Sequence, residues 1–273
     1  MYEFLEKLNQ HNSKKIYTEN NKKTIIQVWT HKCRNQTGYW GIGDMVRGTI
    51  FLFEYCKKNN YNFILDIQLH SVSKYLKHEP HQYSNVILKN KDNIIFVSPN
   101  NISYYTQNEV NFFFTNSFYN FISQDAKYFM RNALTPNDSF KDHLSNYLIQ
   151  DDYSVLHYRL GDNYNGNVVK YLLHLKQHIN VNTKQVFISD CKKLKELVKE
   201  LVKENTTLLI IDIDPGHIGE NINVQNDLIE YFILIHSKKI KTYSNYRSIS
   251  GFVYSVNQVF DIDLINIKHV ELT

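Results

Sequence analysis

The sequence predicts an α/β protein of two domains, with an open parallel sheet in the second. Short runs of β-branched and aromatic residues alternate with segments whose apolar residues recur at helical spacing. Strands that alternate with helices in this way favour a parallel sheet covered on both faces. The chain has 273 residues, of which 42% are hydrophobic and 21% charged, which is enough for two modest domains with their own cores.

The first half opens with the order strand, turn, helix, strand. A strand is predicted over residues 24–30, a glycine cluster follows it, a helix spans 44–58 and a second strand spans 62–67. Residues 70–150 are less regular, with short apolar runs at 93–97 and 112–114 and helices predicted over 118–134 and 140–149. The pattern resets near residues 150–152, so we predict domains over 1–150 and 151–273.

The second half alternates more clearly. The predicted strands are 154–160, 185–189, 207–213 and 240–243, and the predicted helices are 168–179, 191–204, 226–236 and 251–260. Ligands of such sheets bind beyond the carboxyl ends of the strands. We therefore look for the functional residues where these strands end.

The strand at 154–160 delivers His157 and Arg159 on one face, because side chains alternate along a strand. The planar guanidinium of Arg159 can bind two oxygens of a phosphate and stays charged when partly buried. Such a cation would stabilise the negative charge that develops on a departing pyrophosphate. The alternative from residue types alone is an ion pair between Arg159 and Asp162 that closes the strand end.

Two further strand ends carry polar residues. Asp190 follows the strand at 185–189 and either orients Arg159, contacts a ligand, or caps the next helix. Residues 243–251 lie after the predicted strand at 240–243 and lead into the predicted helix at 251–260. There Ser248, Ser250 and Gly251 suit an anion site at a helix start, with Arg247 as a second cation. Plain helix capping by either serine is the alternative.

These segments resemble the motifs of the fucosyltransferases. Residues 157–164, HYRLGDNY, resemble the HxRxGD motif of the α-1,2 type and of the related α-1,6 and protein O-fucosyltransferases. Residues 187–191 resemble that family's strand ending in Ser-Asp-Asp, residues 230–251 its helix-strand-SxFS segment, and residues 41–45, GIGDM, its glycine-rich GLGNQM turn. The order and rough spacing agree over residues 38–258.

The resemblance implies a GT-B fold, in which two Rossmann-like domains face a central cleft. The N-terminal domain would form the acceptor side and the C-terminal domain would bind the nucleotide-sugar. The implied activity is inverting, metal-independent transfer of a sugar to a glycan hydroxyl, with GDP-fucose as the expected donor and no cofactor. The expected partners are thus a nucleotide-sugar and a glycan.

The resemblance and the strand ends together assign roles to individual residues. Arg159 would contact the donor pyrophosphate, and His157 and Asp162 would shape the nucleotide pocket. The sequence itself identifies no catalytic base, and Asp44 is a candidate for that role. The full set of expected donor-binding residues is Gly41, Gly43, His157, Arg159, Asp162, Asp190, Arg247, Ser248, Ser250 and Gly251.

Four positions depart from the family pattern. Leu160 stands where a second arginine is common, Cys191 replaces the second Asp, Asp44 stands at an Asn position and Ile249 replaces Phe. The missing Arg and Asp motivate an alternative function, a non-catalytic protein of the same fold that binds nucleotide or glycan. A third function is a metal-dependent transferase that uses the DxD of Asp212 and Asp214.

Composition limits the function classes. The formal net charge is +4 with scattered lysines, which suits an anionic small ligand better than nucleic acid. The three cysteines form no metal or disulfide pattern, and neither a signal peptide nor an apolar run long enough to span a membrane is present, so we expect a cytoplasmic protein or a soluble piece of a longer one. Eukaryotic members of the family that the chain resembles usually carry a membrane anchor, so the resemblance favours a bacterial or viral protein. His174 and His178, one helical turn apart, are expected on a solvated helix face rather than at a metal.

Overall fold

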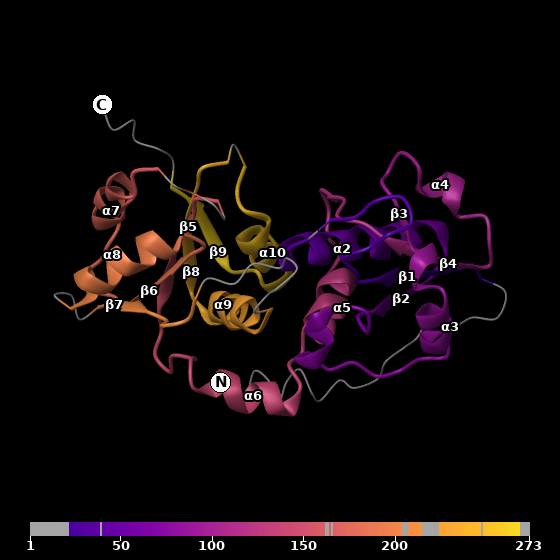
Figure 1. Ribbon diagram of the computed structural model, residues 1–273, viewed down its shortest axis with the longest axis horizontal. Coiled ribbons are helices and arrows are strands. Elements are labelled where there is room, and N and C mark those ends of the chain that lie inside the picture. Colours follow the sequence, from indigo (N-terminus) through magenta and orange to yellow (C-terminus); the bar gives the residue numbers. More distant parts are fainter. Residues whose placement is uncertain are drawn as a thin grey trace. The chain divides into compact units, whose positions relative to one another are not determined.

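The computed structural model describes residues 22–38, 40–161, 164, 166–203, 207–214, 224–246 and 248–267 (Figure 1). The chain divides into two compact units, Met1–Lys141 and Asp142–Thr273. The division falls within α6 (Asp138–Ser145), ahead of the domain boundary predicted at residues 150–152. No helix in the described ranges is long and apolar enough to cross a membrane.

The first unit contains a four-stranded parallel sheet in the order β2-β1-β4-β3. The strands are β1 (Thr24–Val28), β2 (Asn62–Asp66), β3 (Ile95–Phe96) and β4 (Val110–Phe114). The helices are α2 (Ile42–Asn59), α3 (Ser84–Lys89), α4 (Ile102–Tyr105) and α5 (Gln124–Ala133), besides α6 and the short 3₁₀ helices η1 (Ser71–Lys74) and η2 (Lys91–Asn93).

The core of this unit forms between the sheet and α2. All five residues of β1 are buried, as expected for a central parallel strand with both faces covered. Gly48 of α2 lies so close to the backbone carbonyl of Thr115, just beyond β4, that a Cβ on Gly48 would overlap it. The helix can approach the strand end only because this position has no side chain.

The predicted helix at 118–134 begins later than expected, at Gln124. Ser123 is the N-cap, and its hydroxyl accepts a hydrogen bond from the Ala126 backbone N–H. The Ser123 backbone N–H in turn donates to the buried Glu54 carboxylate of α2 at 2.7 Å. A residue remote in sequence thus fixes where the helix starts.

The second unit contains a five-stranded parallel sheet in the order β7-β6-β5-β8-β9. Its strands are β5 (Ser154–Arg159), β6 (Gln185–Ser189), β7 (Leu208–Ile210), β8 (Lys239–Ser244) and β9 (Asp263–Asn266). Its helices are α7 (Val169–Lys176), α8 (Lys192–Val202), α9 (Val224–His236) and α10 (Gly251–Phe260). The sequence predicted four strands, and β9 is a fifth that it missed, because its short run DLIN is mostly exposed and mixes polar with apolar residues.

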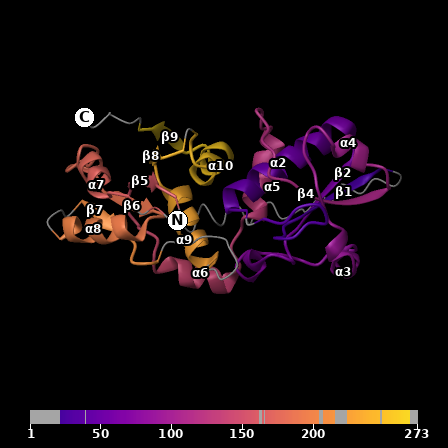
Figure 2. The same ribbon diagram turned by 45° about the horizontal axis from the view of Figure 1, so that its top comes forward.

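Helices cover both faces of this sheet. In Figures 1 and 2, α7 and α8 lie on one side of the strands and α9 and α10 on the other. Because side chains alternate, Leu156 and Tyr158 of β5 point into the core under α7 and α8, while the ring of His157 lies near Phe252 of α10. The strand order reverses between β5 and β8, and ligands of doubly wound sheets bind outside such a switch point.

Candidate functional site

Arg159 is the last residue of β5, the central strand of the second sheet. It is paired in register with Ser244, the last residue of β8. Its carboxyl-terminal position therefore places it directly at the switch point between these two strands. The side chain is 24% exposed, so the guanidinium reaches the surface from a buried strand.

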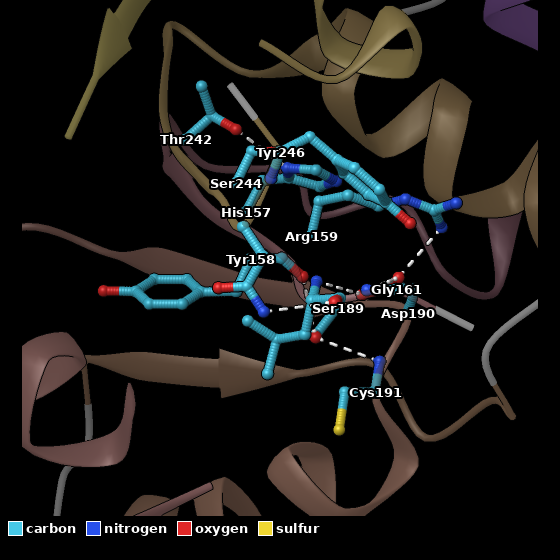
Figure 3. Close-up of polar contacts among 12 residues, drawn as sticks. His157, Tyr158, Arg159, Gly161, Ser189, Asp190, Cys191, Thr242, Ser244 and Tyr246 are labelled. Carbon is cyan, nitrogen blue, oxygen red and sulfur yellow. Dashed lines mark hydrogen bonds and ion pairs between the residues drawn. The ribbon is translucent and has the colours of Figure 1, made fainter. Parts of the chain in front are cut away.

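Asp190 organises the end of β5 (Figure 3). Its Oδ2 lies 2.9 Å from Nη1 of Arg159 and accepts the backbone N–H of Gly161 at 2.8 Å, and its Oδ1 accepts the backbone N–H of Leu160, also at 2.8 Å. The carboxylate is 8% exposed, so these charge-assisted bonds are shielded from water. One side chain from the loop after β6 thus fixes both the backbone after Arg159 and the direction of its guanidinium.

Arg159 is paired with Asp190, whereas the ion pair with Asp162 that the sequence also allowed involves a residue outside the described ranges. Asp190 does not cap α8, because Cys191 is the N-cap residue and its backbone N–H is bonded to Ser189 Oγ at 3.1 Å. The observed contacts of Asp190 agree with the role of orienting Arg159.

Gly161 lets the chain turn away after Arg159. Its φ is +108°, in the region that side chains strongly disfavour. A Cβ there would also lie 3.1 Å from the hydroxyl of Tyr246. Tyr246 follows β8, and its ring centroid is 6.0 Å from the guanidinium carbon of Arg159, within reach of a cation–π contact.

His157 is a buried, neutral support for the strand end rather than an exposed ligand group. It is 3% exposed, and its Nδ1 lies 2.9 Å from Oγ1 of Thr242 on β8. Burial, reinforced by the nearby positive charge of Arg159, lowers the pKa of His157 to about 3. The imidazole therefore carries no charge at neutral pH and ties β5 to β8 by a neutral hydrogen bond.

The start of α10 is the third predicted strand end. Ser250 is its N-cap residue, yet among the described residues its side chain accepts no N–H of the helix. The first backbone amides after Gly251 are therefore not consumed by a serine cap, and helix N-termini favour anions. Ser248 is exposed, and Arg247 lies outside the described residues.

The remaining predicted donor-site residues belong to the first unit. Gly41 is the N-cap residue of α2, and Gly43 is buried in its first turn. Asp44, the candidate base, also lies in that turn and forms an ion pair with Arg47 one turn on. Its carboxylate is 31% exposed.

The DxD carboxylates are paired with lysines of α8. Asp212 is bound by Lys199, and Asp214 lies 3.2 Å from Lys192. Within the described part of the chain, no three His, Cys, Asp or Glu side chains are grouped so as to hold a metal ion. His174 corrects the expectation of a solvated face, because it is buried and its Nδ1 lies 2.8 Å from the Tyr158 hydroxyl. Tyrosines of the core account for this burial.

Residues that the sequence pattern did not single out complete the site. Thr242 holds His157, Tyr246 flanks Arg159, and Asn245 bonds the backbone of β5. All three come from β8 or the loop after it. The paired register of β5 and β8 brings them to Arg159, and no local pattern in the sequence indicates that pairing.

By sequence, neither a protein-family profile nor a curated protein matches the chain. By structure, it is similar to FUT1 of Arabidopsis thaliana solved with GDP, at a TM-score of 0.56 and 11% identity, with 100% of this chain and 75% of that chain covered. The chain has the fold of the fucosyltransferases. The α-1,6-fucosyltransferase NodZ from Bradyrhizobium, co-crystallised with GDP, matches at a TM-score of 0.51 and 8% identity over 88% of this chain and 93% of NodZ.

POFUT1 in complex with GDP gives a third match, with a TM-score of 0.51 and 7% identity over 91% of this chain and 99% of that chain. Two units with parallel sheets in one chain agree with this fold, so the predicted fold class is confirmed. At these identities the likeness establishes the fold, and the activity has to be argued from the residues.

Proposed function

We propose that this protein is a glycosyltransferase that transfers fucose from GDP-fucose to a hydroxyl of a glycan. The observation that carries the proposal is Arg159, a partly exposed cation fixed by Asp190 at the switch point of the second sheet. The fold supports the choice of donor, because FUT1 and NodZ of the same fold were solved with GDP.

In the proposed reaction an acceptor hydroxyl attacks the anomeric carbon of fucose from the side opposite to GDP. A new glycosidic C–O bond forms, the bond to the β-phosphate breaks, and the hydroxyl proton leaves to a base or to solvent. Arg159 stabilises the negative charge that develops on the departing pyrophosphate, so its effect is larger in the transition state than in the bound substrate. Single displacement of this kind inverts the anomeric configuration.

The surrounding residues divide into binding and support. Ser248, Ser250 and the amides after Gly251 are proposed to hold the β-phosphate, since an uncapped helix start favours an anion. Asp190 acts on the donor by orienting Arg159, and His157 links β5 to β8 through its hydrogen bond with Thr242. Asp162 and Arg247 keep their proposed roles in the nucleotide pocket and as a second cation.

The acceptor side is assigned to the first unit by the same proposal. Asp44 stays the candidate base, although its ion pair with Arg47 places a competing cation on the carboxylate that would take the proton. Positioning and leaving-group stabilisation by Arg159 can carry the reaction if Asp44 takes no part. Gly41 and Gly43 shape the first turn of α2 beside it.

The proposed transfer is independent of metal, and the lysine pairs of Asp212 and Asp214 support this choice over the DxD alternative. Both carboxylates are mostly exposed, so a divalent ion would have to displace a lysine from each. Turnover is therefore expected to survive EDTA, and Asp212→Asn is expected to be as active as the wild-type protein.

The function is tested by incubating the protein with GDP-fucose and a library of glycan acceptors, with and without EDTA. We expect release of GDP and a fucosylated product whose anomeric configuration, read by NMR, is opposite to that of the donor. Activity abolished by EDTA and by Asp212→Asn would instead establish the metal-dependent alternative.

A non-catalytic nucleotide-binding protein is the second candidate function. Its support is that Leu160 and Cys191, at the positions of the family's second Arg and second Asp, are both buried in the hydrophobic core of the second unit. The site thus has one cation and one carboxylate fewer than the family pattern. Tight GDP binding with no turnover of GDP-fucose across the acceptor library would favour this function.

A further inference from the structure

Asn245, the first residue after β8, continues the pairing of β8 with β5 past the last residue of both strands. Its backbone N–H donates to the carbonyl of Arg159 at 2.9 Å, and its Nδ2 donates to the carbonyl of Leu160 at 3.1 Å. The two carbonyls belong to the residue that carries the guanidinium and to the next one. The main chain and the side chain of one asparagine therefore bind two consecutive peptide groups, Arg159–Leu160 and Leu160–Gly161.

Two tyrosines bind the amide oxygen of the Asn245 side chain. The hydroxyls of Tyr171, on α7, and of Tyr243, on β8, donate to its Oδ1 at 2.8 and 3.0 Å. Both rings are at most 3% exposed and pack against each other with centroids 5.5 Å apart. Burial, then the neighbouring tyrosines, raise the pKa of Tyr243 to about 12, so its hydroxyl remains a donor at neutral pH.

These donors fix the orientation of the amide. Because both hydroxyls point at one oxygen, the NH₂ group is directed at Leu160 and not toward the tyrosines. Asn245 itself is an exposed residue, yet four hydrogen bonds from α7, β5 and β8 hold it. Three of these bonds are made by the side chain, so its partners order it although it is exposed.

We propose that Asn245 is a positioning residue of the donor site, which holds the backbone that carries Arg159 at the end of β5 against the end of β8. Asp190 binds the N–H groups of Leu160 and Gly161, and Asn245 binds the carbonyls of Arg159 and Leu160. Together the two residues engage both the N–H groups and the carbonyl groups of the backbone at the end of β5.

The inference rests on the proposed function, because the ligand whose affinity is expected to fall when Asn245 is replaced is GDP. Without its side chain, the Leu160 carbonyl and two buried hydroxyls lose a partner, and of the four bonds only the backbone bond of residue 245 to the Arg159 carbonyl remains. A hydrogen bond of this kind is worth about 1 kcal/mol, and a phosphate contact needs its geometry within a fraction of an ångström. Asn245→Ala is expected to weaken GDP binding by about tenfold.

Asn257→Ala is the matched control. Asn257 of α10 also donates from Nδ2 to a backbone carbonyl, that of Ile262, at 2.8 Å. It lies near the end of α10, whose beginning is at the proposed phosphate site. The control removes the same amide and the same type of hydrogen bond from the same unit, away from Arg159. A second test variant, Tyr171→Phe, removes only one hydroxyl donor to Asn245 and keeps the buried ring.

The first measurement is hydrogen–deuterium exchange of the ligand-free protein, which does not depend on what the protein binds. Asn245→Ala is expected to raise deuterium uptake in the segment 157–161, which is remote in sequence, while Asn257→Ala leaves that segment unchanged. Tyr171→Phe is expected to raise it less. Equal uptake at 157–161 in the wild-type protein and Asn245→Ala would overturn the proposal, whether or not GDP binds.

The second measurement is GDP affinity in a double-mutant cycle of Asn245→Ala with Arg159→Ala. If Asn245 acts by positioning Arg159, its loss matters less once the guanidinium is gone, so the two fold-changes multiply to more than the double variant shows. Fully independent effects, or a loss of thermal stability with unchanged GDP affinity, would assign Asn245 a purely structural role and overturn the proposal. A wild-type protein that fails to bind GDP would remove the proposed function, while the exchange data still decide whether Asn245 orders the strand end.

Discussion

Asp190 shows why the chemistry of this site depends on contacts between residues far apart in the sequence. Its carboxylate binds Arg159 and two backbone N–H groups from a segment about 30 residues earlier in the chain. Arginine without such a partner would sample many rotamers at the strand end, and ordering it on binding would cost affinity. A carboxylate that fixes the guanidinium in advance reduces that cost.

His157 gives a prediction at the residue scale for how stability depends on pH. Its folded-state pKa of about 3 lies below the ordinary value of 6.5, so between these values the unfolded chain binds a proton that the folded protein excludes. The stability that His157 contributes is therefore complete above pH 6.5 and is lost as the pH falls toward 3. The expected slope from this one residue is about 1.4 kcal/mol per pH unit.

The measurement is hydrogen exchange of β5 in urea at steps from pH 7.5 down to 4.5, for the wild-type protein and His157→Asn. Asparagine can still bond Thr242 but does not titrate. The free energy of unfolding of the variant should therefore change with pH less steeply, by the contribution of one protonating group. His143→Asn, at the end of α6, serves as the control for removing a histidine. An unchanged slope in His157→Asn would contradict a neutral, buried imidazole.

The positions of His157 and Arg159 at the end of β5 could be predicted from the sequence, but the residues that contact them could not. Alternation along a strand placed His157 and Arg159 on one side of β5, and a strand end followed by glycine marked the site. The roles of Thr242, Asn245 and Tyr246 could not be predicted, because they depend on β8 lying beside β5. Nothing in either segment's own residues indicates that pairing.

At the scale of elements, the approach of α2 to β4 gives a second prediction. Gly48→Ala would place a methyl group against the Thr115 carbonyl, so the helix must shift, at a cost of about 1–3 kcal/mol or more. The neighbouring Trp29 is buried and bonded to Thr49, and both tryptophans of the chain, Trp29 and Trp40, lie in the first unit. The urea midpoint of tryptophan fluorescence therefore reports this unit.

Gly41→Ala is the matched control for this prediction. Gly41 precedes the same helix and has φ −69°, and a Cβ added to it would meet no other atom within 4 Å. Its substitution is expected to cost about 0.5–1 kcal/mol, less than that of Gly48, because alanine is a poorer N-cap than glycine but meets no steric conflict here. Equal midpoints for Gly48→Ala and Gly41→Ala would show that α2 does not pack on the carbonyl of Thr115 as described.

The elements themselves were predicted best where the periodicity is strong and the termini carry local signals. The bounds of β6 and α10 agree with the sequence prediction residue for residue. The irregular part of the first unit was harder, because short elements such as β3 and α4 contain too few residues for a period to show. The late start of α5 depends on Glu54 of another helix, which no local pattern contains.

At the scale of the whole molecule, topology determines where the chemistry lies. The order β7-β6-β5-β8-β9 places the first strand of the second unit at its centre, and the reversal between β5 and β8 creates the ligand position. The sequence predicted parallel sheets, but the order of the strands follows from which buried faces fit together. Because β8 lies beside β5, Arg159 contacts Tyr246 in the loop after β8.

The measurement that tests the central claim most directly is the affinity for GDP, UDP, ADP and CMP, by calorimetry, of the wild-type protein, Arg159→Lys and Arg159→Ala. Arg34→Ala, an exposed arginine of the first unit, controls for the loss of one positive charge. We expect the wild-type protein and Arg34→Ala to prefer GDP, Arg159→Ala to bind it about 10- to 100-fold more weakly, and Arg159→Lys to lie between, because lysine keeps the charge but loses the planar fork. Unchanged GDP affinity in Arg159→Ala, or a preference of the wild-type protein for another nucleotide, would contradict the account.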